Sequence, residues 1–231
     1  MTNTGTTSIT GDVGASPIAV GALTGFGLIP FADGTYSTSP FVVGRVYAAD
    51  MLPPTPAYLN AAIADLLSAK LDAASRLNPS FVGLAAGNLN GLTLEAGLYK
   101  WASALTLTTS VTFDGCESDV WILQITGAVT VGAGASVVVT GGALAANIFW
   151  DIAGAVTVAA GAHIEGILMP TSITFGAGSS LNGAALVQTS ITMSSNIIVK
   201  QSFDSCNPSS APSTGPSLSS EPSTAPSFGP R

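Results

Sequence analysis

The feature that most constrains this chain is a triplet of apolar, threonine and apolar residues that recurs between residues 105 and 193. The triplets centre on Thr106, Thr130, Thr157, Thr174 and Thr192, which are 24, 27, 17 and 18 residues apart. Recurrence at roughly 20 residues is typical of repeat folds, in which each unit buries its apolar side chains against its neighbours. The region from 92 to 199 is therefore predicted to consist of short, stacked β-strands.

Strand alternation predicts where these side chains point. If the flanking apolar residues face inward, each central threonine faces outward, together with the residues two positions away. Those outer neighbours are all small, and they are Ala104, Thr108, Ala128, Ala155, Ala159, Ser172, Ser190 and Ser194. Stacked strands repeat at about 4.8 Å. The sequence thus predicts a flat, regular face of threonine with small neighbours and almost no charge.

Composition narrows the partners that such a face could have. Only 8% of the residues are charged, six of them are Lys or Arg, and the net charge is −7. Nucleic-acid binding needs basic patches that neutralise phosphates, and docking on anionic lipid needs the same. The sequence also lacks a run of about 20 apolar residues that could span a bilayer. We therefore expect neither a nucleic-acid nor a membrane partner.

The chain divides by composition into a domain at 1–200 and a tail at 201–231. Pro and Ser dominate the tail, which cannot bury enough apolar surface to offset its ordering entropy, so disorder is predicted there. Residues 55–77 form the one long helical pattern, with Thr55 as the expected N-cap, Pro56 at the first helical position, and Asn78-Pro79 as the stop. Its expected apolar stripe comprises Leu59, Ile63, Leu66, Leu67, Lys70, Leu71, Ala74 and Leu77.

Candidate chemical groups are sparse. His163 is the only histidine, so neither a His-based metal cluster nor a Ser-His-Asp triad is predicted, although Glu165 could pair with it. Asp12 and Asp50 are interpreted as structural hydrogen-bonding groups. The acidic loop with Asp114, Glu117 and Asp119 is interpreted as a solvated turn, with weak calcium binding as the alternative. We expect no catalytic residues, no metal and no cofactor.

Two other features leave alternatives open. Cys116 and Cys206 could form a disulfide that ties the tail to the domain, or they could be unrelated thiols. Trp121 and Trp150 could suggest sugar stacking, but they lie in apolar strands and are interpreted as core residues.

Several motifs resemble the microbial ice-binding-like domain family. They are TNTGTTSITGDVGASPIAVGALTGFGLIP near the start, GRVYAAD at 44–50, GLTLEAGLYKW at 91–101, SDVWILQITG at 118–127, and the whole stretch 147–193. The motifs occur in the family's order and cover nearly all of residues 3–200. The resemblance implies a mainly β fold, a discontinuous right-handed β-solenoid of triangular cross-section, with one long helix packed alongside and an N-terminal coil placed among the C-terminal ones.

The resemblance also implies a site and a function. The family uses one flat solenoid face, which would comprise Thr24, Thr106, Thr130, Thr157, Thr174 and Thr192 with Ser172 and Ser190, extended by Ser8 and Thr10. We expect a secreted, monomeric, non-enzymatic antifreeze protein that binds ice, with moderate thermal hysteresis and inhibition of ice recrystallisation. The alternative is an extracellular adhesin or carbohydrate-binding module. No signal peptide is visible after Met1. Family members usually carry a further apolar strand before the NTG motif, so a solenoid beginning at Met1 would lack one edge strand.

Overall fold

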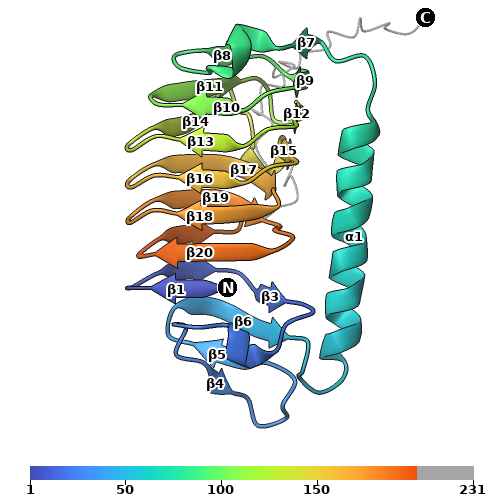
Figure 1. Ribbon diagram of the computed structural model, residues 1–231, viewed down its shortest axis with the longest axis vertical. Coiled ribbons are helices and arrows are strands. Elements are labelled where there is room, and N and C mark those ends of the chain that lie inside the picture. Colours follow the sequence, from blue (N-terminus) through green and yellow to red (C-terminus); the bar gives the residue numbers. More distant parts are fainter. Residues whose placement is uncertain (202–231) are drawn as a thin grey trace, which may run out of the picture. The chain divides into compact units, whose positions relative to one another are not determined.

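Parallel strands stack into coils along most of the chain, and successive coils supply strands to three faces (Figure 1). The structure is a computed structural model that describes residues 1–201, and these form one compact unit. The Ser/Pro-rich segment and Cys206 lie outside the described residues, apart from Gln201 at the start of that segment. The predicted mainly β solenoid with a single α-helix is confirmed.

The first face is a six-stranded parallel sheet, which we call the threonine sheet. Its strands lie in the order β1-β20-β18-β16-β13-β10. Their bounds are Thr2–Thr4 for β1, Ser190–Ser194 for β20, Ser172–Phe175 for β18, Val156–Val158 for β16, Val129–Val131 for β13 and Leu105–Leu107 for β10.

The other two faces are joined into one large sheet because two strands turn a corner of the solenoid. Strand β17 pairs with β14 at His163 and with β15 from Ile167 onward, so its two halves lie on different faces. The second face contains β8 (Thr93–Leu94), β11 (Ser110–Asp114), β14 (Ser136–Thr140), the first half of β17 (His163–Met169) and of β19 (Ser180–Ala185), β21 (Ile197–Val199) and β2 (Ser8–Thr10). The third contains β7 (Phe81–Val82), β9 (Gly97–Trp101), β12 (Trp121–Ile125), β15 (Ile148–Ile152) and the remaining halves.

The solenoid is discontinuous in sequence, as expected. Strands β1 and β2 from the N-terminus pair in parallel with β20 and β21 from the C-terminal part. Beyond them lies a cap that consists of β3 (Val13–Ala15), η1 (Val20–Ala22), β4 (Ile29–Pro30), β5 (Ser37–Ser39) and β6 (Val42–Ala48). Short turns η2 (Leu84–Gly87) and η3 (Ala145–Asn147) complete the coils.

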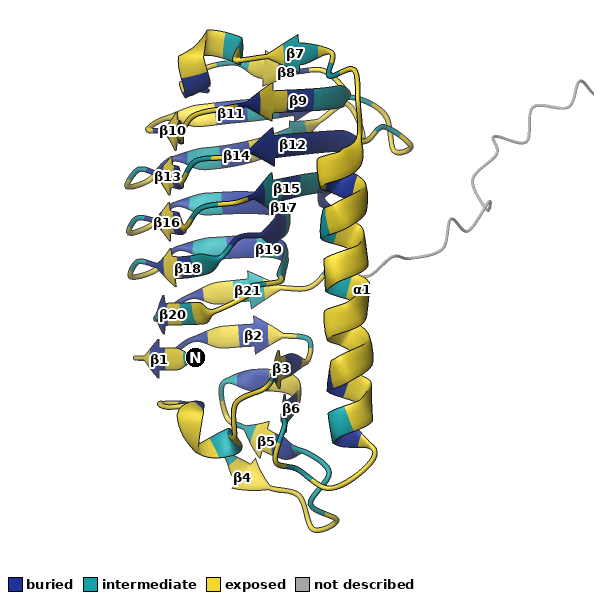
Figure 2. Ribbon diagram, turned by 45° about the vertical axis from the view of Figure 1, so that its right-hand side comes forward, coloured by how far each residue is buried: buried dark blue, intermediate teal, exposed yellow. Residues whose placement is uncertain are grey.

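Helix α1 (Thr55–Ser75) runs along the third face from the cap to about the level of β12 (Figures 1 and 2). It ends before the expected residue 77. Pro56 lies second in the helix and not first as predicted, because the first helical residue is Thr55, which is not the N-cap. Its hydroxyl instead donates a hydrogen bond to the carbonyl of Thr35 and so ties the start of the helix to the cap.

The expected apolar stripe of α1 is largely wrong. Leu59 is buried and Leu66 half-buried, but Ile63, Ala74 and Leu77 are exposed, as are Leu67 and Leu71 at 56% and 71%. Figure 2 shows the outer surface of the helix as mostly exposed.

The helix is held instead through a small apolar contact and polar anchors. Ala73 packs against Ile122 and Met169 of the third face. The Lys70 ammonium lies 2.9 Å from an Asp151 carboxylate oxygen. The Gln124 amide donates to carbonyls in the last turn of the helix and just beyond it. Small and polar contacts of this kind cannot be recognised from the apolar periodicity of the helix.

The core lies between the three faces and is filled by the inward residues of every strand. Trp121 is fully buried and its indole N–H donates to the Leu94 carbonyl, and Trp150 is 3% exposed with its N–H on the Glu165 carbonyl. Both tryptophans are thus core residues, as predicted. Phe113 meets both rings edge-on.

Candidate functional site: the threonine face

One exposed threonine from each strand of the threonine sheet lies in a single register. The parallel pairing aligns Thr106 with Thr130, Thr130 with Thr157, Thr157 with Thr174, Thr174 with Thr192, and Thr192 with Thr2. A bridge pairs Thr2 with Thr24, and at the other end one pairs Thr106 with Asn88. We call the seven threonines the threonine row. All of them are exposed.

The row is straight because the strands that carry it are alike. Strands β10, β13 and β16 each bury the residues on both sides of the threonine, and β18 does the same with Ile173 and Phe175. These inward side chains stack on one another through the same register, so the coil-to-coil spacing is that of parallel strands, about 4.8 Å. Strand alternation then fixes each threonine outward, as predicted.

Small residues flank the row on both sides. On one side, Ser172 is registered with Ser190, and Ala104, Ala128 and Ala155 occupy the same position in their strands. On the other side the corresponding positions are Thr4, Ser194, Gly176, Ala159, Gly132 and Thr108. None of these side chains is long enough to rise above the threonines, so the face stays flat.

Thr2 was missed by the sequence pattern, although it lies within the row. Its strand reads Thr-Asn-Thr, and the inward residue is Asn3, which is registered with Met193 of β20. A search for apolar residues on both sides of a threonine therefore passes over it. Thr24 was expected only from the family resemblance, and the structure does bring it to the end of the row, where its hydroxyl lies 3.3 Å from that of Thr2.

Ser8 and Thr10 do not extend this face, which corrects the expectation for them. Both lie on β2, which pairs with β21 and β6 on the second face. The corner formed by residues 5–7 separates β2 from β1, so their side chains leave the solenoid from a different side. The other eight predicted positions share the threonine face, and they are Thr24, Thr106, Thr130, Thr157, Thr174, Thr192, Ser172 and Ser190.

The face is also electrically neutral. The six strands of the threonine sheet consist of uncharged residues throughout. Charged side chains lie on other elements, such as Asp12, whose carboxylate accepts the backbone N–H of Arg45 at 2.8 Å, and Asp50, which accepts that of Val20. Both aspartates thus have the structural role that the sequence predicted.

A polar cluster on the second face has some of the bonds of a catalytic triad. The His163 ring lies 2.7 Å from the Ser180 hydroxyl through Nδ1 and 2.8 Å from a Glu165 oxygen through Nε2, and Asn182 holds the other carboxylate oxygen. The expected pairing of His163 with Glu165 is therefore confirmed. The backbone N–H groups of His163 and Ser180 donate to carbonyls of the neighbouring strands and corners. They are therefore not free to stabilise an oxyanion. We interpret it as a structural network.

Two further candidates, the acidic loop and Cys116, lie next to each other. Within residues 1–201 there is no group of three or more His, Cys, Asp or Glu residues that could hold a metal ion. The acidic loop uses Asp119 to accept the Cys116 N–H at 2.8 Å. Cys116 itself is exposed.

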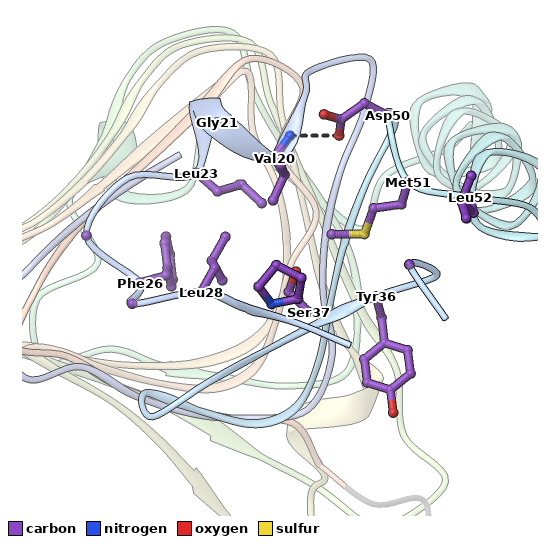
Figure 3. Close-up of a pocket in the computed structure, with 14 residues that line it drawn as sticks. Val20, Gly21, Leu23, Phe26, Leu28, Tyr36, Ser37, Asp50, Met51 and Leu52 are labelled. Atoms are coloured by element: carbon purple, nitrogen blue, oxygen red, sulfur yellow. Dashed lines mark hydrogen bonds between the residues drawn. The ribbon is translucent and has the colours of Figure 1, made fainter. Parts of the chain in front are cut away.

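A cavity of about 420 Å³ lies in the cap (Figure 3). Its walls are mainly apolar, with Leu23, Phe26 and Leu28 on one side and Met51 and Leu52 on another. It does not adjoin a cluster of titratable groups. Within the described part of the chain, no helix is long and apolar enough to cross a membrane.

The sequence and the fold have clear relatives. The ice-binding-like family model matches residues 1–199. An ice-binding protein of Leucosporidium sp. is 43% identical over 187 residues, which is 80% of this chain and 72% of that protein. Ice-binding protein K3-B1 of Typhula ishikariensis is 46% identical over 167 residues, or 72% of this chain and 69% of that one.

Among solved structures, the ice-binding protein LeIBP from an Arctic yeast superposes with a TM-score of 0.85 at 40% identity and covers 87% of both chains. An ice-binding protein domain of Shewanella frigidimarina superposes with a TM-score of 0.76 at 26% identity, over 87% of this chain and 91% of that one. The match to the family model includes every strand of the threonine sheet, since it covers residues 1–199. The chain therefore belongs to the ice-binding-like protein family.

Proposed function

We propose that this protein adsorbs to ice through the threonine row and the small residues beside it. The observation that carries the proposal is the unbroken register from Thr106 to Thr24, with one exposed threonine on each successive strand. The names of the relatives support ice as the ligand. We assign the activity to the solenoid, residues 1–200, and not to the tail.

The chemistry of threonine suits a surface that orders water. Each site presents a methyl group, which disfavours bulk-like hydration, and a hydroxyl group, which can donate and accept hydrogen bonds. A row of such sites at the strand spacing can hold an ordered water layer that joins a growing crystal. The affinity arises from many weak contacts made together on a preorganised surface. Flatness therefore matters more than any one hydroxyl.

The flanking rows limit how strong the activity is. A second regular row of threonines would double the number of matched sites, but here Ala, Gly and Ser occupy most flanking positions. We therefore expect moderate thermal hysteresis together with inhibition of recrystallisation. We further propose that the protein acts outside the cell, as a monomer and without enzymatic activity, because ice adsorption requires only this face.

The first experiment follows a single ice crystal as a solution of the purified protein is cooled slowly below its melting point. The wild type should produce a faceted crystal that stops growing over a measurable temperature gap. Thr157→Tyr should reduce that gap to less than about a tenth at equal concentration, because a ring that rises above the plane prevents the neighbouring contacts from forming together. The unfolding temperature should stay within a few degrees, since Thr157 is exposed.

Thr10→Tyr is the matched control. Thr10 is an equally exposed strand threonine, but it lies on the second face. It should leave the temperature gap unchanged. A folded wild-type protein in which crystals grow freely would refute the proposed function. Equal loss of activity in both variants would refute the assigned face.

A further inference from the structure

The threonine row crosses a joint in the chain between Thr192 and Thr2. On the Thr192 side of the joint the coils follow one another in sequence. On the Thr2 side the strands are β1 and β2, which belong to the N-terminal part of the chain. The corners that link the threonine sheet to the second face are unequal here. Between registered positions, His163 lies six residues after Thr157, Ser180 six after Thr174 and Ser8 six after Thr2, but Ile197 lies only five after Thr192.

The buried corner residue changes character as the joint is approached. It is Ala135 and Ala162 in the middle coils, and then Ser179, Asn196 and Thr7, all 3% exposed or less. Buried polar side chains are costly unless they are hydrogen-bonded, so this change requires a specific reason.

The reason is a continuous chain of hydrogen bonds that crosses the joint. The Asn196 amide donates to the Ser179 hydroxyl at 2.9 Å and to the Gly176 carbonyl at 2.7 Å, and its oxygen accepts the Ser194 N–H. The Asn196 N–H donates to the Thr7 hydroxyl, which itself donates to the Asn3 side chain at 2.6 Å.

Asn3 then fixes the far side of the joint. Its amide donates to the Gly25 carbonyl at 3.0 Å, and its backbone N–H donates to the Thr24 carbonyl at 2.9 Å. Gly25 has φ +78, and a Cβ atom there would lie 1.9 Å from the Asn3 carbonyl oxygen, so the two segments touch backbone to backbone. The position of Thr24 on the face thus depends on Asn3.

At the joint, side chains add hydrogen bonds between neighbouring corners that the alanine corners do not have. Where successive corners match, as in the alanine coils, the backbone groups pair with each other. At the corner formed by Ser195 and Asn196, the Asn196 side chain adds donors to two carbonyls that also accept backbone N–H groups, that of Gly176 from Ser179 and that of Ser179 from Ile197. Thr7 and Asn3 transmit the same registration to the N-terminal coil.

We propose that Asn196, Thr7 and Asn3 are positioning residues that carry the ice-contacting plane across the joint, so that Thr2 and Thr24 bind ice together with Thr192. This inference rests on the proposed function of the threonine row. It predicts that the working surface includes the N-terminal coil and that its alignment depends on a network that does not itself touch ice.

Thr7 offers the sharpest test because a matched pair of variants separates its hydroxyl from its shape. Thr7→Val keeps the volume but leaves the Asn3 oxygen and the Asn196 N–H without their partner, whereas Thr7→Ser keeps the hydroxyl. Thr7→Val should lower thermal hysteresis at least about two-fold at equal concentration, because the contacts of the N-terminal coil are lost from the array. Thr7→Ser should restore most of it.

A stability control distinguishes positioning from general destabilisation. Gln124→Ala removes buried hydrogen bonds to α1 on the third face and should lower the unfolding temperature while leaving hysteresis unchanged. Hydrogen exchange supplies the local readout. In Thr7→Val the amide of Asn3 should exchange at least about ten times faster than in the wild type, whereas Gln124→Ala should not affect it.

Thr2→Tyr and Thr24→Tyr test the extended plane directly, since both residues are exposed and neither belongs to the network. Each should reduce hysteresis as Thr157→Tyr does. If Thr157→Tyr abolishes activity while Thr2→Tyr, Thr24→Tyr and Thr7→Val all retain it, the plane ends at Thr192 and this inference is wrong, whereas ice adsorption through the threonines from Thr106 to Thr192 still holds. If the folded wild type does not stop ice growth, the proposed function fails and this inference fails with it.

Discussion

The ion pair between Lys70 and Asp151 allows a quantitative test of how α1 is held. The two side chains are only 16% and 13% exposed, and their charged atoms are 2.9 Å apart. Lys70 has a second acceptor, the Met169 carbonyl at 2.6 Å. The two ends of the pair are therefore not equivalent, and removing one should not cost the same as removing the other.

Lys70→Met leaves a largely buried carboxylate without its cation and the Met169 carbonyl without its donor. We expect it to lower the free energy of unfolding by about 3 kcal/mol, at the lower end for a broken buried pair because Asp151 retains some contact with water. Asp151→Asn leaves the ammonium on the Met169 carbonyl and offers it an amide oxygen, so the expected loss is about 1 kcal/mol. The double variant removes both charges and should lose about 2 kcal/mol, which gives a coupling energy of about 2 kcal/mol.

Urea denaturation followed by tryptophan fluorescence would measure these values, provided that the slope of the transition is the same in all four proteins. Thermal hysteresis should be unchanged in each, because the pair lies on the third face. A greater loss for Asp151→Asn than for Lys70→Met, or a coupling energy below about 0.5 kcal/mol, would refute the reasoning.

Two further predictions concern stability. Burial, with a contribution from Glu95, raises the pKa of Tyr99 to about 12. Because an unfolded tyrosine titrates near 10, the folded state holds this proton more tightly, and the free energy of unfolding should fall as the pH rises from about 10 towards 12. Tyr99→Phe should flatten that slope, and an equal slope in both proteins would contradict the assignment. At Gly183, a Cβ atom would lie 2.0 Å from the Gly166 carbonyl oxygen, so Gly183→Ala should cost about 3 kcal/mol or more in urea denaturation. Gly161→Ala, which meets open space at φ +66, should cost only about 1 kcal/mol, and similar losses for the two would show that the coils can move apart.

The central coils could be predicted from sequence because alternation and burial agree there. In β13 and β16 the triplet Val-Thr-Val both favours a strand and buries its two valines, so local pattern and tertiary packing give the same answer. The registered row from Thr106 to Thr192 follows directly from stacking such triplets.

The ends of the face could not be predicted in this way. At Thr2 the inward position belongs to Asn3, whose burial depends on hydrogen bonds to Thr7 and Gly25. At Thr10 the local sequence Ser-Ile-Thr resembles a face strand, but which face a strand occupies depends on how many corners precede it. Neither property is local, so a short pattern cannot report it.

For the helix, too, the local pattern does not predict which residues contact the rest of the protein. Its leucines recur at helical spacing, yet Leu67 and Leu71 are exposed. Of the residues that hold it, Ala73 lies outside the expected stripe, and the partners of Lys70 and Ala73, Asp151 and Gln124, lie far away in sequence. Polar contacts between α1 and the third face can be identified only when the positions of both surfaces are known.

These polar anchors stabilise the fold on the side away from the threonine sheet. Lys70 contacts Asp151 on β15 and Met169 on β17, and Gln124 on β12 holds the end of α1. The helix thus connects three successive coils on the third face, and those coils also supply the threonine sheet. A surface that binds through many simultaneous weak contacts loses affinity if its coils shift independently. On the threonine sheet the strand register and the buried network at the joint prevent such shifts, whereas the ties along α1 contribute to stability. Both sets of contacts leave the outer surface of the threonine sheet free of charged and bulky side chains.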